Sequence, residues 1–225
     1  MPAPPPPKRH PYNQWSPDAR ALDLVGDKWT LLIVRDLASG PRRFVELQRV
    51  LPGISTEQLR SRLNRMVADG LLTRQRYREV PPRVDYELTE RAKQLLPVVG
   101  ELARWGYNWA WGPPRPDEAI DIGAVFRCAP GMVRLPSDAS GSIELMVGQR
   151  AYTLVCERGG VRIEERTGPE ARARVGGSER AWIEALGPTS SRVDLEIEGD
   201  RGLANAVLDG FSAMAARAGG MRAAM

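Results

Sequence analysis

The sequence STEQLRSRLNRMVADG, residues 55–70, decides the fold of the first half of the chain. Ser55 is a good helix N-cap because its side-chain oxygen can accept a hydrogen bond from a backbone N–H one turn later, and Gln58 completes a capping-box pattern. Gly70 stands where a left-handed C-cap would end the helix. Apolar residues recur at helical spacing and predict one buried stripe: Leu59, Leu63, Met66 and Val67. The opposite face is polar and positively charged.

Two strand-like runs follow this helix, LLTRQRYR at residues 71–78 and RVDYELT at residues 83–89, joined by EVPP. Arginines alternate along the first run and therefore leave one face of the strand: Arg74, Arg76 and Arg78. A polar helix followed by an arginine-rich hairpin is what a winged helix needs to enter a major groove and hold the neighbouring phosphates.

Four further helices are expected around this core: Pro17–Val25, residues 28–40, residues 44–51 and residues 89–111. Ser16 and Asp27 are the expected caps of the first two, and Trp29 is expected in the core. A Pro-Gly turn separates the third helix from residues 55–70, which predicts a helix-turn-helix unit. Pro97 should kink the last helix.

Residues 89–111 carry more apolar side chains than a small core needs. We interpret the excess as a dimer interface, formed together with the first helix and centred on a few residues: Leu22, Leu102, Trp105 and Trp109. In the alternative interpretation, three tryptophans pack on the chain's own second domain: Trp105, Trp109 and Trp111. The two interpretations are compatible.

The length of 225 residues favours two domains. Residues 1–115 carry 19 Lys and Arg against 12 Asp and Glu, and the remainder carries 13 against 16. A basic first half indicates a polyanionic partner, although a solvated arginine-rich surface is an alternative. The chain shows no apolar run long enough for a membrane span and no secretory signal, and its two cysteines fit a reducing cytoplasm.

The predicted organisation has five parts. Residues 1–15 are a flexible proline-rich tail, residues 16–111 the winged-helix and dimerisation domain, and GPPRP at residues 112–116 a stiff linker. Residues 117–218 read as an α+β domain, with a five-stranded sheet covered by helices, and residues 219–225 as a tail. The order of elements in the α+β domain is α-β-β-β-β-α-β-α, beginning with a helix at residues 117–128.

Residues 12–111 resemble the HxlR family of winged-helix transcriptional regulators. Four segments carry the resemblance in order: GDKWTLLIVRDL, GPRRF, LPGIS and VPPRVDYELT. It implies a homodimer that binds an inverted-repeat operator in double-stranded DNA, in the cytoplasm and associated with the bacterial nucleoid. Many redox-sensing members carry a cysteine where this chain has Ser16, which cannot form a thiolate.

The second domain resembles, more weakly, the sterol-carrier-protein type 2 fold, on its element order and the stretch RVDLEIEGDRGLANAVLDGF. That resemblance implies an apolar cavity for a hydrophobic small-molecule effector; a filled core is the alternative. The function expected is a repressor that responds to such an effector, and the rival is a lipid or metabolite carrier. Catalysis, a cofactor and a metal are not expected, because the one histidine, His10, lies in the tail and no metal-ligand cluster or phosphate loop is recognisable.

Ten residues are predicted to contact DNA. Gln58, Ser61 and Arg65 point furthest from the apolar stripe, and Thr56 lies at the start of the helix, so these four are expected near bases. The others are assigned to phosphates or to the minor groove beside the wing: Arg42, Arg43, Arg62, Arg76, Arg78 and Arg83. Ion pairing is the alternative role, of Arg83 with Glu79 or Asp85 and of Arg62 with Asp69.

Overall fold

The computed structural model describes residues 11–77, 83–136, 139–157, 160–168, 170–188 and 190–212. The chain divides into two compact units, Met1–Leu95 and Leu96–Met225. Most of the predicted N-terminal tail, the predicted tail at residues 219–225 and the predicted contact residue Arg78 lie outside the described residues. None of the helices in the described ranges is long and apolar enough to cross a lipid bilayer.

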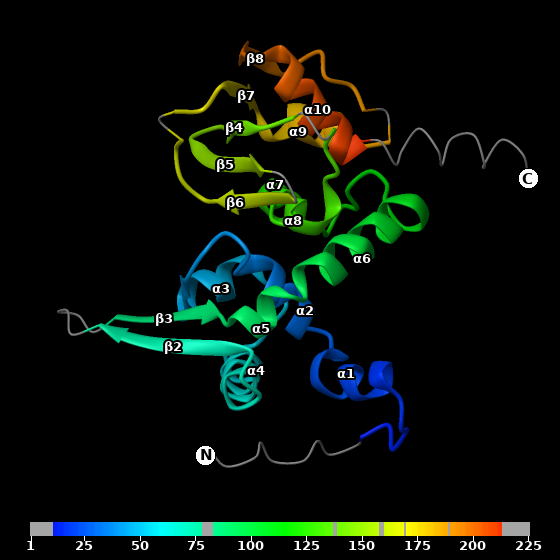
Figure 1. Cartoon of the computed structure of the whole chain (residues 1–225), viewed down its shortest axis with the longest axis vertical. Helices are drawn as coiled ribbons and strands as arrows, with labels where there is room; N and C mark the ends of the chain where they lie inside the picture. The colour runs from blue at the N-terminus through cyan, green and yellow to red at the C-terminus, as the bar shows by residue number, and fades with distance from the viewer. Residues whose placement is uncertain are drawn as a thin grey trace, which may run out of the picture. The chain divides into compact units, whose positions relative to one another are not determined.

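The first unit is a winged helix, as predicted (Figure 1). Strands β1, β3 and β2 form an antiparallel sheet in that order, and the pair formed by β2 and β3 is the wing. The two-residue strand β1 has no equivalent in the sequence prediction. The elements are α1 (Pro17–Val25), α2 (Thr30–Asp36), β1 (Arg42–Arg43), α3 (Phe44–Val50), α4 (Thr56–Ala68), β2 (Leu72–Tyr77), β3 (Arg83–Leu88) and α5 (Glu90–Lys93).

The predicted helix at residues 89–111 is interrupted. It forms α5 and then, after a turn at Gln94 and Leu95, α6 (Leu96–Trp109). Pro97 lacks an N–H and its ring crowds the preceding turn, but the first turn of a helix tolerates both effects. The chain therefore ends one helix and starts another at this proline, instead of kinking a continuous helix.

The second unit is an α+β fold with a five-stranded sheet, as predicted, and the sheet is mixed (Figure 1). The strand order is β6-β5-β4-β7-β8, and β4 and β7 are its parallel pair. The elements after α6 are α7 (Ile122–Phe126), α8 (Ala129–Met132), β4 (Gly141–Val147), β5 (Arg150–Glu157), β6 (Gly160–Glu164), β7 (Ala173–Gly177), α9 (Glu179–Leu186), β8 (Glu196–Gly199) and α10 (Arg201–Ser212).

The prediction of a helix at residues 117–128 is wrong for its first part. The chain becomes helical only at Ile122, because Asp121 folds back to form an ion pair with the buried guanidinium of Arg127 at the end of α7. Pro130 and Gly131 then give α8 a non-helical interior. The result is two short helices where one was expected.

Helix α6 packs closely on α8. A Cβ placed on Gly100 would lie 2.1 Å from the carbonyl carbon of Gly131, so only glycine fits at residue 100. One turn later, Arg104 donates hydrogen bonds to the carbonyl oxygens of Gly131 and Met132, at 2.7 and 2.9 Å. These contacts assign α6 to the second unit, whereas the sequence prediction placed it in the first domain.

The end of α6 is also held within the second unit. Tyr107 and Trp111 stack with ring centroids 5.1 Å apart, and both donate to the carbonyl oxygen of Leu186, at 3.2 and 3.0 Å. Burial raises the pKa of the Tyr107 hydroxyl above its ordinary range. Another face of α6 remains exposed and carries apolar side chains at intervals of four, three and four residues: Val98, Leu102, Trp105 and Trp109.

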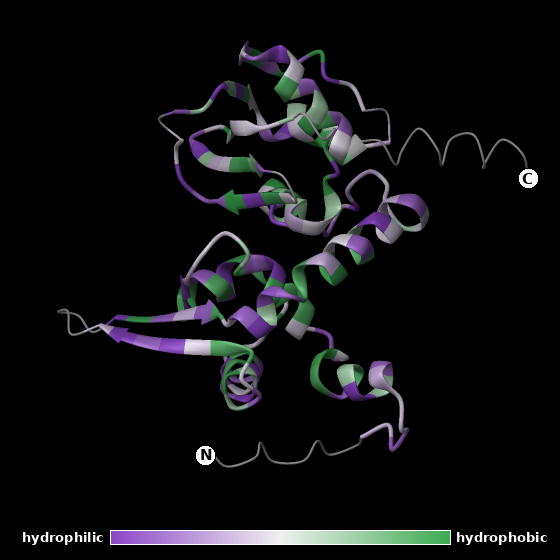
Figure 2. Cartoon of the chain, in the orientation of Figure 1, coloured by the Kyte–Doolittle hydropathy of each residue, from purple (hydrophilic) through white to green (hydrophobic). Residues whose placement is uncertain are grey.

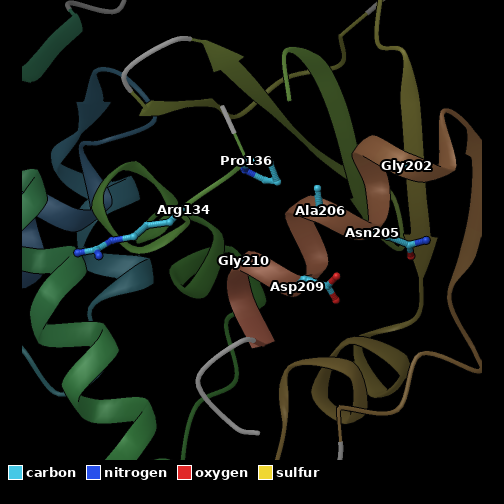
Figure 3. Close-up of a pocket in the computed structure, with 7 residues that line it drawn as sticks. All are labelled: Arg134, Pro136, Gly202, Asn205, Ala206, Asp209 and Gly210. Carbon is cyan, nitrogen blue, oxygen red and sulfur yellow. The ribbon is translucent and has the colours of Figure 1, made fainter. Parts of the chain in front are cut away.

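The interior of the second unit is filled by aromatic side chains. Phe126 lies 5.3, 4.8 and 5.9 Å, centroid to centroid, from Tyr152, Trp182 and Phe211, and all four are fully buried. The surface of this unit carries an open depression of about 420 Å³ (Figure 3). Residues of α10 and of the segment after α8 line it: Arg134, Pro136, Gly202, Asn205, Ala206, Asp209 and Gly210.

Candidate nucleic-acid interface

Helix α4 is fixed to the first unit along one face and capped at its start. Leu59, Leu63 and Met66 are fully buried beneath it. The backbone N–H of Gln58 donates to Ser55 Oγ at 3.2 Å, and the Ser55 N–H donates to Gln58 Oε1 at 3.1 Å. The predicted stripe and capping box are therefore present, and the helix presents its other side to solvent as a rigid surface.

The exposed residues of α4 before its last turn are polar: Thr56, Glu57, Gln58, Arg60, Ser61 and Asn64. Some of these groups already have partners. Thr56 Oγ1 accepts a hydrogen bond from Gln48 at 2.7 Å, and Arg60 pairs with Glu57 at 3.1 Å. The Gln58 amide oxygen belongs to the cap, so one of its two acceptor positions is in use, and Gln58 can bind a base through both polar atoms only by sharing or exchanging that bond.

Ser61 and Asn64 are the polar groups of this face whose side chains bond to no other residue among those the structure describes. Asparagine pairs well with the major-groove edge of adenine, and serine can accept from or donate to several bases. Asn64 is a functional candidate that the sequence prediction placed on the polar face but did not select. Its signal was its position on the polar face, three residues after Ser61.

Arg62 and Arg65 are tied to carboxylates. Arg62 pairs with Asp27 at 3.1 Å, not with Asp69 as the alternative expected, and about a quarter of its side chain is exposed. Arg65 donates to Asp69 at 2.9 Å, and the Asp69 side chain is almost completely buried. Both arginines can therefore reach DNA only at the expense of an ion pair within the first unit.

Arg42 and Arg43 occupy β1 but differ in exposure. Arg42 is partly buried and donates to the Asp36 carbonyl oxygen at 2.7 Å, so it closes the end of α2. Arg43 is half exposed, and its guanidinium lies 3.9 Å from a carboxylate oxygen of Asp85. Of the two, Arg43 has the more accessible charge for a phosphate.

Arg83 at the start of β3 is held by Asp85, as the alternative expected. Its Nε lies 2.9 Å from both carboxylate oxygens and its Nη2 lies 2.6 Å from one of them. Its guanidinium also lies 5.3 Å from the centre of the Tyr77 ring. These hydrogen bonds from Arg83 lower the pKa of the buried Asp85 carboxyl against the opposing effect of burial, and the charge of Arg43 adds to the effect.

Strand β2 carries the accessible cations of the wing, and it is hydrophilic along most of its length (Figure 2). Arg76 is exposed and pairs with no carboxylate in the described ranges. Arg74, two residues earlier and on the same face, lies 5.9 Å from the ring centre of Tyr86. Arg49 on α3 is a further exposed arginine without an ion pair among the described residues, and the sequence prediction did not select it.

Comparisons with known proteins match this part of the chain. A profile of the HxlR-like helix-turn-helix family matches residues 24–112. An HTH-type transcriptional regulator of Halalkalibacterium halodurans is 44% identical over 94 residues, which cover 41% of this chain and 83% of that regulator. The HTH-type transcriptional regulator YvaP of Bacillus subtilis is 36% identical over 90 residues, covering 40% of this chain and 83% of YvaP.

Among solved structures, the reduced form of the transcriptional regulator YodB from B. subtilis is 33% identical, with a TM-score of 0.39, and the match covers 43% of this chain and 96% of YodB. The family match contains α4, both strands of the wing and α6, and it ends at residue 112. Regulators of this kind are not enzymes. The chain belongs to the HxlR-like helix-turn-helix family and is a winged-helix, DNA-binding transcriptional regulator.

Proposed function

We propose that the protein is a homodimeric repressor that binds a specific inverted-repeat DNA operator and responds to a hydrophobic small molecule. The observation that supports this most is the pairing of an exposed, polar α4 face with accessible arginines on β2 of the same unit. A base-reading helix and a backbone-binding wing are the two parts that a winged helix uses on DNA. This activity would place it in the cytoplasm, associated with the nucleoid.

In the proposed complex each α4 enters one major groove, and the two half-sites lie about 34 Å apart. Ser61 and Asn64 face the bases, joined by Thr56 and Gln58 once their present hydrogen bonds are exchanged. Cations along the wing and β1 bind the phosphates of the DNA backbone. If about six to eight phosphates are neutralised per dimer, the logarithm of the binding constant falls with the logarithm of salt concentration at a slope near −5 to −7.

The proposed dimer forms through the exposed apolar face of α6. Its residues recur at the alternating four- and three-residue spacing that lets two helices interlock: Val98, Leu102, Trp105 and Trp109. Leu22 of α1, which is 43% exposed, is the proposed contribution of the first helix. Aromatic residues are the usual anchors of such interfaces, so Trp105 and Trp109 would supply most of the affinity.

The proposed effector binds to the second unit or at the dimer interface. The aromatic filling of the interior supports the filled-core alternative over a tunnel of the sterol-carrier type, so the open depression on α10 is the better candidate. The effector can change DNA binding only by as much as its own affinity differs between the DNA-binding state of the dimer and the other state. A lipid carrier with a non-reading winged helix is the second candidate, and the accessible arginines of β2 argue against it.

Fluorescence anisotropy tests the proposal with a labelled duplex from the protein's own upstream DNA and a random duplex, each at two salt concentrations. We expect tight, salt-sensitive binding to the first duplex, and loss of the preference in Asn64→Ala. Lys93→Gln is the control because Lys93 is exposed and lies on α5, outside α4 and the two strands of the wing. Equal binding to both duplexes by the wild type would exclude a sequence-specific regulator of that region.

Sedimentation equilibrium tests the dimer. Trp105→Glu should convert the dimer into a monomer, since a charge would be buried at the centre of the interface. A dimer of unchanged affinity in this variant would place the interface elsewhere.

A further inference from the structure

A second surface feature of the first unit lies beside the exposed face of α4. It is an open depression of about 310 Å³, lined by Trp29 at the start of α2 and by residues of the first half of α4: Glu57, Gln58, Ser61 and Arg62. The sequence analysis expected Trp29 in the core. Its side chain is only partly buried, and it forms the one aromatic wall of this depression.

Trp29 and its neighbour Lys28 present unused polar groups here. The Lys28 ammonium is exposed, lies 4.8 Å from the centre of the Trp29 ring and pairs with no carboxylate among the residues that the structure describes. The indole N–H of Trp29 has no acceptor in the same described ranges. A cation and a neutral N–H donor side by side are suited to an anionic oxygen.

One carboxylate fixes both walls of the depression. Asp27 Oδ1 accepts from the backbone N–H groups of Trp29 and Thr30, at 2.9 and 3.1 Å. The other oxygen, Oδ2, lies 3.1 Å from the Arg62 guanidinium on α4. Asp27 therefore sets the distance between Trp29 and the helix, so the depression keeps its shape without a ligand.

The charges around the depression leave it positive. Lys28, Arg60 and Arg62 carry positive charge, whereas Asp27 and Glu57 carry negative charge. Arg62 forms an ion pair with Asp27 across the depression. Arg60 forms an ion pair with Glu57 along α4. Lys28 is left as the uncompensated charge.

We propose that Lys28 and Trp29 form a binding site for one phosphodiester group of the DNA backbone, at the edge of the groove that α4 occupies. The Lys28 ammonium supplies the charge, the indole N–H donates to a phosphate oxygen, and the indole face packs on the adjoining deoxyribose. Arg62 acts as a positioning residue through Asp27. This inference rests on the proposed function, because it requires α4 to enter DNA.

The test uses the full-length protein and duplexes that the wild type selects from a random-sequence library. Lys28→Gln should weaken binding about threefold to tenfold, to selected and random duplexes alike, and reduce the steepness of the salt dependence by about 0.9 per half-site. Trp29→Phe keeps the aromatic face but removes the N–H, so it should weaken binding without changing the salt slope. Lys93→Gln removes an equal charge from α5 and should bind like the wild type.

A chemical substitution in the DNA identifies the phosphate. Neutral methylphosphonate is placed at one backbone position at a time, and one position in each half-site should weaken wild-type binding without further weakening Lys28→Gln. The site would be overturned if, at every position, the loss of affinity caused by methylphosphonate added fully to the loss caused by Lys28→Gln. An unchanged salt slope in Lys28→Gln would overturn it too. Neither result would contradict sequence-specific binding. If the wild type selects no sequence at all, the proposed function fails and this site fails with it.

Discussion

The arginines of α4 and those of β2 look alike in the sequence but occupy opposite situations in the structure. Arg62 and Arg65 on α4 each meet an aspartate, at 3.1 and 2.9 Å, and are mostly buried. Arg74 and Arg76 on β2 are exposed and meet no carboxylate among the described residues. An arginine with an acidic partner stabilises the fold, whereas one without such a partner is available to DNA. The position on a recognition helix does not decide between these roles.

The difference follows from the cost of separating charges. Removing one partner of a largely buried ion pair leaves the other charge poorly solvated, which is more costly than the pair is worth. An exposed arginine on an edge strand carries no such constraint, because water solvates it before and after binding. Substitutions in the two regions should therefore change different quantities.

The largest effect on stability is expected from Arg65→Ala. It leaves the carboxylate of Asp69, whose side chain is 1% exposed, without its ion-pair partner, so the free energy of unfolding should fall by about 2–3 kcal/mol. Urea denaturation at neutral pH measures this. In the double variant Arg65→Ala/Asp69→Ala the loss should be smaller than the sum of the single losses. A stable Arg65→Ala protein with lost operator binding would instead make Arg65 a reading residue.

The next effect is expected at Asp85, and it depends on pH. Asp85→Asn weakens the hydrogen bonds from Arg83 and should cost about 1.5–2 kcal/mol at neutral pH. The folded-state pKa of Asp85 is lowered, so its stabilising contribution is complete above the ordinary aspartate pKa, near about 3.9, and is lost as pH falls through the lower folded value. Urea titrations at neutral and acidic pH measure this. Between the two pH values the free energy of unfolding should fall less in Asp85→Asn than in the wild type. An equal fall in both proteins would contradict this assignment.

The smallest effect on stability is expected from Arg76→Gln, within about 0.5 kcal/mol of the wild type. Its effect should appear in DNA binding, where the salt slope should become shallower by about 0.9 per half-site. Arg43, half exposed near Asp85, should behave in between. If Arg76→Gln destabilised the protein as much as Arg65→Ala, the contrast between the two regions would be lost.

Local rules were sufficient for much of the first unit. The capping box, the buried stripe of α4 and the left-handed Gly70, with φ near +70°, all follow from residues within one or two turns of each other. The alternation of arginines on β2 follows from the two-residue period of a strand. The five-stranded sheet of the second unit was likewise visible from strand spacing.

The partners of charged groups could not be predicted in the same way, because they are set by contacts between distant parts of the chain. Arg62 has an acid seven residues away, Asp69, but meets Asp27 from the start of α2 instead. The exposure of Trp29 and the cap-bound state of Gln58 also depend on three-dimensional neighbours. The predicted DNA contacts therefore stay predictions, weighted now toward residues without such partners.

The contact between Gly100 and Gly131 has an evolutionary consequence. In an isolated helix, replacing an interior glycine with alanine is favourable by about 1 kcal/mol. In this chain the same change would force a methyl group into the backbone of α8. The sign of one substitution thus depends on whether α8 is packed on α6. A lineage that acquired this arrangement needed glycine at residue 100 beforehand or at the same step, and could replace it only after losing the contact.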